Sequence, residues 1–412
     1  MKNKVSFIVD FFSYGLKGGS SYYAWLGILS LFIFPWAYGS YQQMVAKGMI
    51  VAGFTDQISW AVYEGNFVFL VGVAAAAVTV VFPYYVYNYK TLKNVVLIGE
   101  MLAITAVLLV MLFIIYHMGR PDRLWHLAPI IGIFSWPNSI LTWDVIVLNG
   151  YLVLNLICAF YNMYKRYTGQ PLNEKFYMTF VYISIVWALT IHTVTAFLMN
   201  TMATRPMWFH SLMPLKFLAT AFAAGPALII VALLTIRKNT KLEIPDEAID
   251  LLSQIVVWFL GVALFLLLSE VVTELYPSTE HSFQLKYALF GMFGLSKMVP
   301  WSWTSYLVMI GSFVLLLIPR VRKNYTILPI ICVSLFIGIW IDKGYALVIS
   351  GMIPSPLGEF SEYTPTWIEI FIVAGNWAIG FMIFTILAKG AVGVMLGDVI
   401  HPSVAGKEVA HH

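Results

Sequence analysis

The residues best suited to chemistry gather in one short segment, HMGRPDRLWHLAP at 117–129, which contains two His, two Arg and one Asp. The whole chain of 412 residues is 60% hydrophobic and only 11% charged, so this concentration of titratable groups stands out. A His that titrates near neutral pH and a partly buried carboxylate can exchange the two protons of a two-electron reaction. They can also hydrogen-bond to the two carbonyls of a quinone, which makes the segment a candidate quinone site.

A further carboxylate, Asp144, lies 18 residues after His126, at the start of the next apolar run. Pro129 and Pro137 between them disfavour a continuous helix and favour a loop that folds back at the membrane surface. We therefore predict that His126 and Asp144 meet and form the catalytic pair. The alternative is structural, with salt bridges formed by the charged residues of 120–123 and with His126 only capping the loop.

Apolar runs of about the 20 residues that a membrane-spanning helix needs must position these side chains. They predict an all-α integral membrane protein with ten transmembrane helices. The net charge of +4 is small and dispersed, so we expect a lipid bilayer and no nucleic acid as a partner. The runs lie at 22–45, 58–89, 93–117, 139–165, 174–203, 212–236, 250–275, 302–321, 325–350 and 364–390.

The Lys and Arg residues between these runs predict the orientation of the chain. An even number of helices puts both termini on one side, and twice as many Lys and Arg residues fall on that side as on the other. Because cytoplasmic loops carry the excess of positive charge, both termini are predicted to be cytoplasmic. The segment 117–129 then lies on the outer face, between the third and fourth helices.

The fourth predicted helix carries polar residues at alternating spacings of four and three, so that they share one helical face. Such a stripe, running inward from Asp144, predicts a hydrated path for protons. The alternative is that its polar side chains only hydrogen-bond to neighbouring helices and hold them together. The stripe consists of Asp144, Leu148, Tyr151, Asn155, Cys158 and Asn162.

Other ionisable residues fall inside the apolar runs, where a charge costs about 2.5–3.5 kcal/mol on insertion scales. Each is therefore a candidate for the proton path. Glu270 and Glu274 stand four residues apart at the end of the seventh helix, and their repulsion is expected to keep one of them protonated. For the adjacent residues Asp342 and Lys343 we favour local charge compensation over a functional role. The candidates are Glu64, Glu100, His192, Glu270, Asp342 and Lys343.

The chain offers few residues that could hold a redox cofactor of its own. Cys158 and Cys332 are isolated within apolar runs, so no zinc site or iron-sulfur cluster is expected. A bis-histidine haem needs two deep His residues, and only His192 is central, so we expect no haem and no metal in this chain. Any such centre is expected in a partner subunit.

Three motifs resemble those of the NrfD/PsrC family, the membrane subunits of respiratory molybdoenzymes and related complexes. The ten predicted helices resemble the longer branch of that family, which includes the membrane subunits of alternative complex III, of the DsrP/HmcC group and of the menaquinone reductase complex Qrc. The chain looks most like the last of these. The motifs are GRPDRLWHL at 119–127, PNSILTWDVIVLNGYL at 137–152 and ISWAVYEGNFVFLVGVAAAA at 58–77.

The resemblance implies two four-helix bundles, formed by helices 2–5 and 6–9, flanked by helices 1 and 10. It therefore divides the chain into an N-terminal segment with helix 1, a first bundle that holds the quinone site, a second bundle, and helix 10 with the C-terminal tail. These parts are expected at 1–57, 58–211, 212–350 and 351–412.

The resemblance also implies a function. It indicates a bacterial inner-membrane subunit that exchanges electrons between menaquinone and a periplasmic iron-sulfur subunit, with menaquinone reduction favoured and proton translocation as a possible addition. A multihaem cytochrome c and a molybdopterin-type subunit are expected alongside. Menaquinone is the expected bound substrate. The implied quinone-binding residues are Arg120, Asp122, His126, Trp143, Asp144 and Glu64.

Three alternatives stay open. A menaquinol-oxidising subunit would run the same chemistry in reverse. A secondary transporter is suggested by the central His192 and by a weak internal repeat between FLVGVAAAAV at 69–78 and FLATAFAAGP at 217–226. A passive membrane anchor would use its polar residues only to hold a partner.

Overall fold

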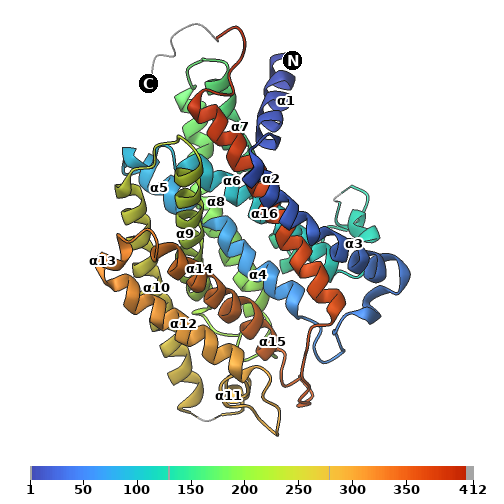
Figure 1. The fold of residues 1–412 in the computed structure, drawn as a ribbon. Helices are drawn as coiled ribbons and strands as arrows, with labels where there is room; N and C mark the ends of the chain where they lie inside the picture. The colour runs from blue at the N-terminus through green and yellow to red at the C-terminus, as the bar shows by residue number, and fades with distance from the viewer. Residues whose placement is uncertain (1, 129, 278, 405–412) are drawn as a thin grey trace.

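The computed structural model describes residues 2–128, 130–277 and 279–404, and within these ranges every regular element is a helix. Nine of the helices described there are long and apolar enough to cross a membrane, which makes the chain an integral multi-pass membrane protein (Figure 1). The nine candidate spans are Val62–Tyr85, Val96–His117, Ile140–Tyr167, Glu174–Asn200, Met213–Asn239, Asp246–Leu275, Val299–Leu317, Leu328–Gly351 and Trp367–Leu396.

Seven of these spans are single helices, and two are interrupted. The interrupted spans are α4 (Val62–Ala75) with α5 (Val78–Tyr85), and α14 (Leu328–Ile339) with the π-helical turn η6 (Trp340–Ala346) and α15 (Leu347–Gly351). The single helices are α6 (Val96–His117), α7 (Ile140–Tyr167), α8 (Glu174–Asn200), α9 (Met213–Asn239), α10 (Asp246–Leu275), α12 (Val299–Leu317) and α16 (Trp367–Leu396).

The first predicted helix, 22–45, is not continuous. It forms as α2 (Ser20–Leu31) and α3 (Ile33–Tyr41), which meet at Phe32. Pro35 explains the break, because proline has no N–H and its ring crowds the carbonyl four residues earlier, at Leu31. This pair is not among the nine candidate spans, so the count of ten stays a prediction, as does the cytoplasmic position of the termini.

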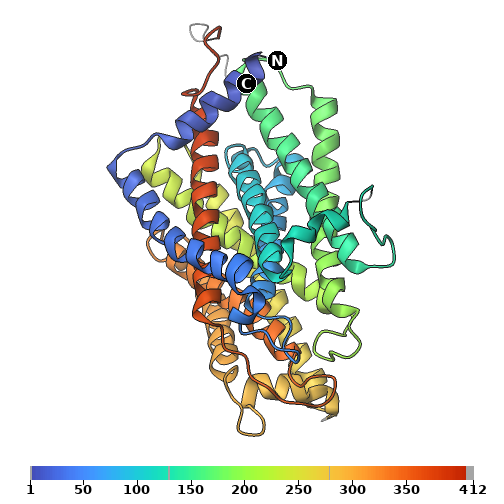
Figure 2. The same cartoon turned by 90° about the vertical axis from the view of Figure 1, so that its right-hand side faces the viewer.

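Three shorter helices were not predicted from the sequence: α1 (Lys2–Leu16), α11 (Phe283–Phe290) and α13 (Pro319–Arg322). The first of them buries Phe7 and Phe11 against the core. Helix α1 and the C-terminal end of α16 lie at the same end of the molecule (Figures 1 and 2). Helix α11 lies at the opposite end, which we call the far end.

Helix α4 is the centre of the molecule, and all of its residues are buried. Small residues let neighbouring backbones approach it, since a Cβ on Gly65 would stand 2.8 Å from the carbonyl oxygen of Gly344. On its other side a Cβ on Gly225 would stand 1.7 Å from that of Ala76. Helix α4 therefore packs against α6 and α8 and also against α9 and η6, and it joins the two halves of the chain.

Lys216 and Lys343, which fall inside the predicted runs 212–236 and 325–350, are both buried. Lys216 lies in the first turn of α9, and Lys343 lies in η6. Neither is available to interact with lipid headgroups or water at a membrane surface, and both have partners inside the protein.

Candidate functional site

Two buried carboxylates and a histidine come together at the ends of α4, α6 and α7. Glu64 occupies the first turn of α4 and His117 the last turn of α6, where a helix favours an acid and a base respectively. His117 Nε2 lies 3.7 Å from Glu64 Oε2. Glu64 Oε2 and His117 Nδ1 are buried and have no hydrogen-bond partner among the described residues, so both are free to bind a ligand.

Asp144 completes this group, which we call the first cluster: Glu64, His117, Asp144 and Thr195. Asp144 is 1% exposed, and its charge interacts with that of Glu64. The hydroxyl oxygen of Thr195 lies 2.8 Å from Asp144 Oδ1 and 2.9 Å from the carbonyl oxygen of Ile191. A hydroxyl has one proton to donate. Thr195 can donate it to the Asp144 carboxylate, or donate it to Ile191 and accept a proton from the Asp144 carboxylic acid, so both states of Asp144 are accommodated.

His126 forms no hydrogen bond or ion pair with Asp144 among the described residues. His126 lies in the 3₁₀ helix η4 (Pro121–Leu127), is exposed, and rests its ring 3.8 Å from that of Trp125. The loop runs along the surface, so the histidine beside the carboxylates is His117. The sequence contained a signal for this pairing, because His117 ends the predicted helix 93–117 and Glu64 lies near the start of the preceding predicted helix, 58–89.

The other residues predicted in the loop hold its shape. Arg120 and Asp122 form a bidentate ion pair with N–O distances of 2.9 and 2.7 Å, and both side chains are mostly exposed. The Arg120 guanidinium holds the pKa of Asp122 below its usual value through this hydrogen bonding. The Trp143 indole N–H donates to the carbonyl oxygen of Pro137 over 2.7 Å. These contacts match the structural alternative for the charged loop residues.

The predicted stripe on α7 does face the core, and all six of its residues are buried. Its side chains bond both within α7 and to neighbouring helices: Tyr151 donates to the carbonyl oxygen of Ala74 on α4, and Asn155 donates to that of Tyr151. Asn162 donates to the Tyr177 hydroxyl on α8. Glu100 on α6 lies near the stripe, and its buried Oε2 has no hydrogen-bond partner in the described part of the chain. These bonds are those of interhelical packing, with Glu100 as a candidate proton carrier beside them.

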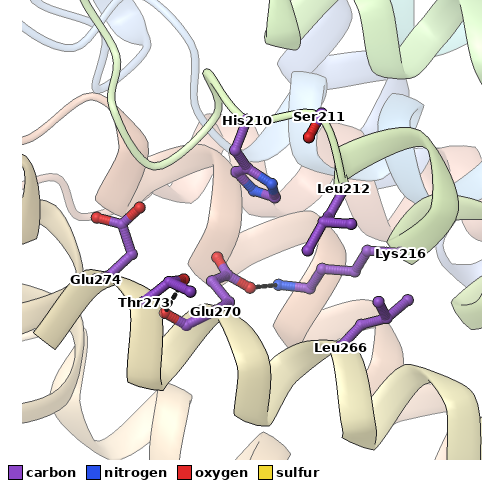
Figure 3. A pocket seen from close by; sticks show the side chains of 8 residues that line it. All are labelled: His210, Ser211, Leu212, Lys216, Leu266, Glu270, Thr273 and Glu274. Carbon is purple, nitrogen blue, oxygen red and sulfur yellow. Dashed lines mark hydrogen bonds and ion pairs between the residues drawn. The ribbon is translucent and has the colours of Figure 1, made fainter. Parts of the chain in front are cut away.

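A second group lies between α9, α10 and η6. Lys216 Nζ and Glu270 Oε2 form a buried ion pair at 2.5 Å, and the charge of Asp342 interacts with both residues. Lys216 therefore compensates the charge of Glu270, and the predicted repulsion between Glu270 and Glu274 acts beside this ion pair (Figure 3). Lys216 lies inside the predicted run 212–236 but was not among the candidates for the proton path. We call Lys216, Glu270 and Asp342 the second cluster.

Lys343 does not form an ion pair with its neighbour Asp342, within the ranges described. Its Nζ lies 2.9 Å from His192 Nε2 on α8 and 3.4 Å from the carbonyl oxygen of Phe217, and it stands over the Phe217 ring. The π-helical turn places the two consecutive side chains against different helices. The charges of Asp342 and Lys343 still interact, and Lys343 gains contacts with α8 and α9 in addition.

Comparison with known proteins places the chain among membrane subunits of reductases. The family described as Polysulphide reductase, NrfD matches residues 51–354. A selenate reductase subunit of Mesobacillus selenatarsenatis is 22% identical over 293 residues, which cover 63% of this chain and 65% of that protein. The chain therefore spans slightly less than two thirds of this relative.

Two further relatives are archaeal. A putative dimethyl sulfoxide reductase membrane subunit of Halobacterium salinarum is 23% identical over 398 residues, or 87% of this chain and 88% of that protein. An Hdr-like menaquinol oxidoreductase integral membrane subunit of Archaeoglobus fulgidus is 22% identical over 213 residues, or 52% and 51% of the two chains.

Proposed function

Because this chain belongs to the NrfD polysulphide reductase family, we propose that it is the quinone-reactive membrane subunit of a respiratory reductase complex. The observation that carries the proposal is the first cluster, in which Glu64, His117 and Asp144 gather with unpartnered polar atoms. Reduction of a quinone takes up two electrons and two protons. A partner subunit supplies the electrons, and the first cluster supplies the protons.

Each residue of the first cluster has a distinct task in this scheme. The Asp144 carboxylic acid and the Glu64–His117 pair each deliver one proton to a quinone oxygen, because acids and a histidine of this kind act as general acids. His126, together with Arg120, Asp122 and Trp143, shapes the loop in which the headgroup rests. His126 is exposed and contributes binding rather than proton supply.

Menaquinone is the proposed substrate, with reduction as the favoured direction. The similarity to the archaeal menaquinol oxidoreductase subunit supports this quinone, and the similarity to the selenate and dimethyl sulfoxide reductase subunits supports a reductase complex. A periplasmic iron-sulfur subunit would deliver the electrons, alongside a multihaem cytochrome c and a molybdopterin-type subunit. We place the chain in the bacterial inner membrane with both termini in the cytoplasm.

Protons for the reaction would cross the protein along two groups of buried residues. On α7 and α6 these are Tyr151, Asn155, Asn162 and Glu100, and in the rest of the molecule they are His192, Glu270, Asp342 and Lys343. Cytoplasmic uptake would make the reaction charge-separating, and periplasmic uptake would leave it neutral.

The test is binding of a fluorescent quinone-site inhibitor to the purified complex, with His117→Ala and Asp144→Asn compared at equal folded yield. We expect saturable binding to the wild type and at least tenfold weaker binding to both variants. The matched control is Glu247→Gln, because Glu247 is an exposed acid in the first turn of α10 and is not part of the first cluster. Undiminished binding in both variants would place the quinone elsewhere, and absence of binding to the wild type would refute the proposed function.

A further inference from the structure

A buried glutamine, Gln43, bridges the two helices that carry Glu64 and His117. It lies in the π-helical turn η1 (Gln42–Ala46), which follows α3, and only 3% of its surface is exposed. Single π-helical turns often occur at functional sites. Gln43 belongs to neither of the two clusters defined above, so its role follows from the groups that it binds.

Both halves of the Gln43 amide form hydrogen bonds to neighbours of the first cluster. Its Nε2 donates to the carbonyl oxygen of Tyr116 over 2.9 Å, and its Oε1 accepts from the Tyr63 hydroxyl over 2.7 Å. Tyr116 immediately precedes His117 in the last turn of α6. Tyr63 immediately precedes Glu64 in the first turn of α4. One side chain therefore joins the two helix ends that carry the proposed proton donors.

Each of the two bonded groups needs a partner from outside its own helix. The Tyr116 carbonyl lies in the last turn of α6, where carbonyl groups lack an N–H partner within the helix. The Tyr63 side chain is fully buried, and a buried hydroxyl without a hydrogen bond is costly. Because one rigid amide group satisfies both, it fixes the distance between the end of α6 and the start of α4.

The chain that follows Gln43 packs directly on the first cluster. The Phe54 ring lies edge-on to the His117 ring, with centroids 5.8 Å apart, and 5.7 Å from the Tyr63 ring. A Cβ on Gly119 would stand 2.9 Å from Met49 Cγ, so this chain also touches the turn after α6. We call residues 42–54 the covering segment.

Helix α16 holds the covering segment from the opposite side. The backbone N–H of Gly53 donates to Glu369 Oε2 over 2.9 Å, and the Thr366 hydroxyl donates to the carbonyl oxygen of Val51 over 2.9 Å. Glu369 is fully buried and completes the capping box at the start of α16. The covering segment is thus fixed at both ends, and the glutamine binds the two helix ends from a fixed position.

We propose that Gln43 is a positioning residue that sets the distance between Glu64 and His117. It acts through Tyr63 and Tyr116, and the inference rests on the proposed function, in which the Glu64–His117 pair delivers a proton. His117 Nε2 and Glu64 Oε2 stand 3.7 Å apart, which is beyond hydrogen-bond distance. A small shift of either helix end therefore decides whether the two can share a proton, and a misplacement of about 1 Å costs up to about 10²-fold in rate.

The first test is a double-mutant cycle in the complete complex, with steady-state quinone reduction as the measurement. Gln43→Met keeps the length of the side chain and removes both hydrogen bonds, so we expect kcat about tenfold lower and KM within about twofold of wild type. In a His117→Ala background the same change should lower kcat by less than about twofold, because the pair that it positions is already lost. A full tenfold loss in that background would overturn the inference.

Gln284→Met is the matched control, at the far end of the molecule. Gln284 is also buried in a short helix, α11, and its amide also binds on both sides. Its Oε1 accepts from the Met207 N–H over 2.6 Å, and its Nε2 donates to the carbonyl oxygen of Gly351 over 2.7 Å. We expect similar losses of melting temperature in both variants and an unchanged kcat in Gln284→Met. Equal losses of kcat would show that Gln43 only holds the fold together.

The second test needs no activity and measures the two helix ends directly. Hydrogen–deuterium exchange should become about threefold faster or more in peptides containing Tyr63 or Tyr116 when Gln43→Met is introduced. Gln284→Met should leave these peptides unchanged. Unaltered exchange at both helix ends would overturn the inference, whereas absence of quinone reduction by the wild-type complex would refute the proposed function.

Discussion

The first and second clusters are built from similar groups but balance their charges differently. The first cluster holds two buried carboxylates with a histidine and a threonine, and no Lys or Arg forms an ion pair with them among the described residues. The second holds two buried carboxylates with Lys216 between them. A buried acid without a compensating cation is easier to protonate than a carboxylate that is stabilised by a cation. This difference supports the proposal that the first cluster exchanges protons with the quinone and that the second lies only on a proton path.

The largest expected effect is a difference in the rate of quinone reduction between a variant of the first cluster and a variant of the second. Asp144→Asn removes a proton donor at the proposed headgroup, so quinone reduction should fall by about 10²-fold or more. Glu270→Gln should lower turnover severalfold at most, because Glu270 is not part of the first cluster. Steady-state quinone reduction by the complex measures both. Equal losses in the two variants would contradict the division of tasks.

The next effect concerns stability. Lys216→Ala leaves Glu270 as a buried charge without a partner, which costs about 3–5 kcal/mol in free energy of unfolding. The double variant Lys216→Met with Glu270→Leu removes both charges and should recover most of that loss. Thermal unfolding in detergent compares them. If the double variant is no more stable than Lys216→Ala, the ion pair is not what holds α9 to α10.

A smaller effect distinguishes the two histidines of the outer segment. His117→Ala should lower kcat about 10²-fold, because His117 contacts Glu64 and supplies a proton. His126→Ala should raise KM severalfold and keep kcat, because His126 is exposed and only binds. Steady-state kinetics over a range of quinone concentrations separates the two. A loss of kcat confined to His126→Ala would restore His126 as the proton donor.

The smallest effect is expected in the loop. The Arg120 guanidinium lowers the pKa of Asp122, so this carboxylate stabilises the folded loop above the usual pKa of Asp and loses that contribution as pH falls below it. The pair is mostly exposed to solvent, so Asp122→Asn should leave the melting temperature almost unchanged at pH 7. Melting curves at pH 7 and pH 3 check this; a large shift at pH 7 would show that the loop is more buried in the complex.

Much of the architecture follows from the order of residues. Long apolar runs predicted nine of the spans to within a few residues, because a helix satisfies its own backbone hydrogen bonds in a bilayer. The 3.6-residue period predicted that the stripe from Asp144 to Asn162 faces the core. The cost of an unpaired charge in an apolar run pointed to Glu64, Glu270 and Asp342. Pro35 indicates a break in the first predicted helix, but the apolar residues around it favoured a continuous helix.

The partners of these residues depend on contacts between helices. The sequence marks Glu64, Asp144, Glu270 and Lys343 as buried in a membrane, because composition and period act along a single helix. Only the tertiary structure pairs them with His117, Thr195, Lys216 and His192, since each partner comes from another helix. The register between helices is set where small residues let backbones touch, as at Gly65 with Gly344 and at Gly225 with Ala76. Packing across the core, rather than any local pattern, decides which charges meet.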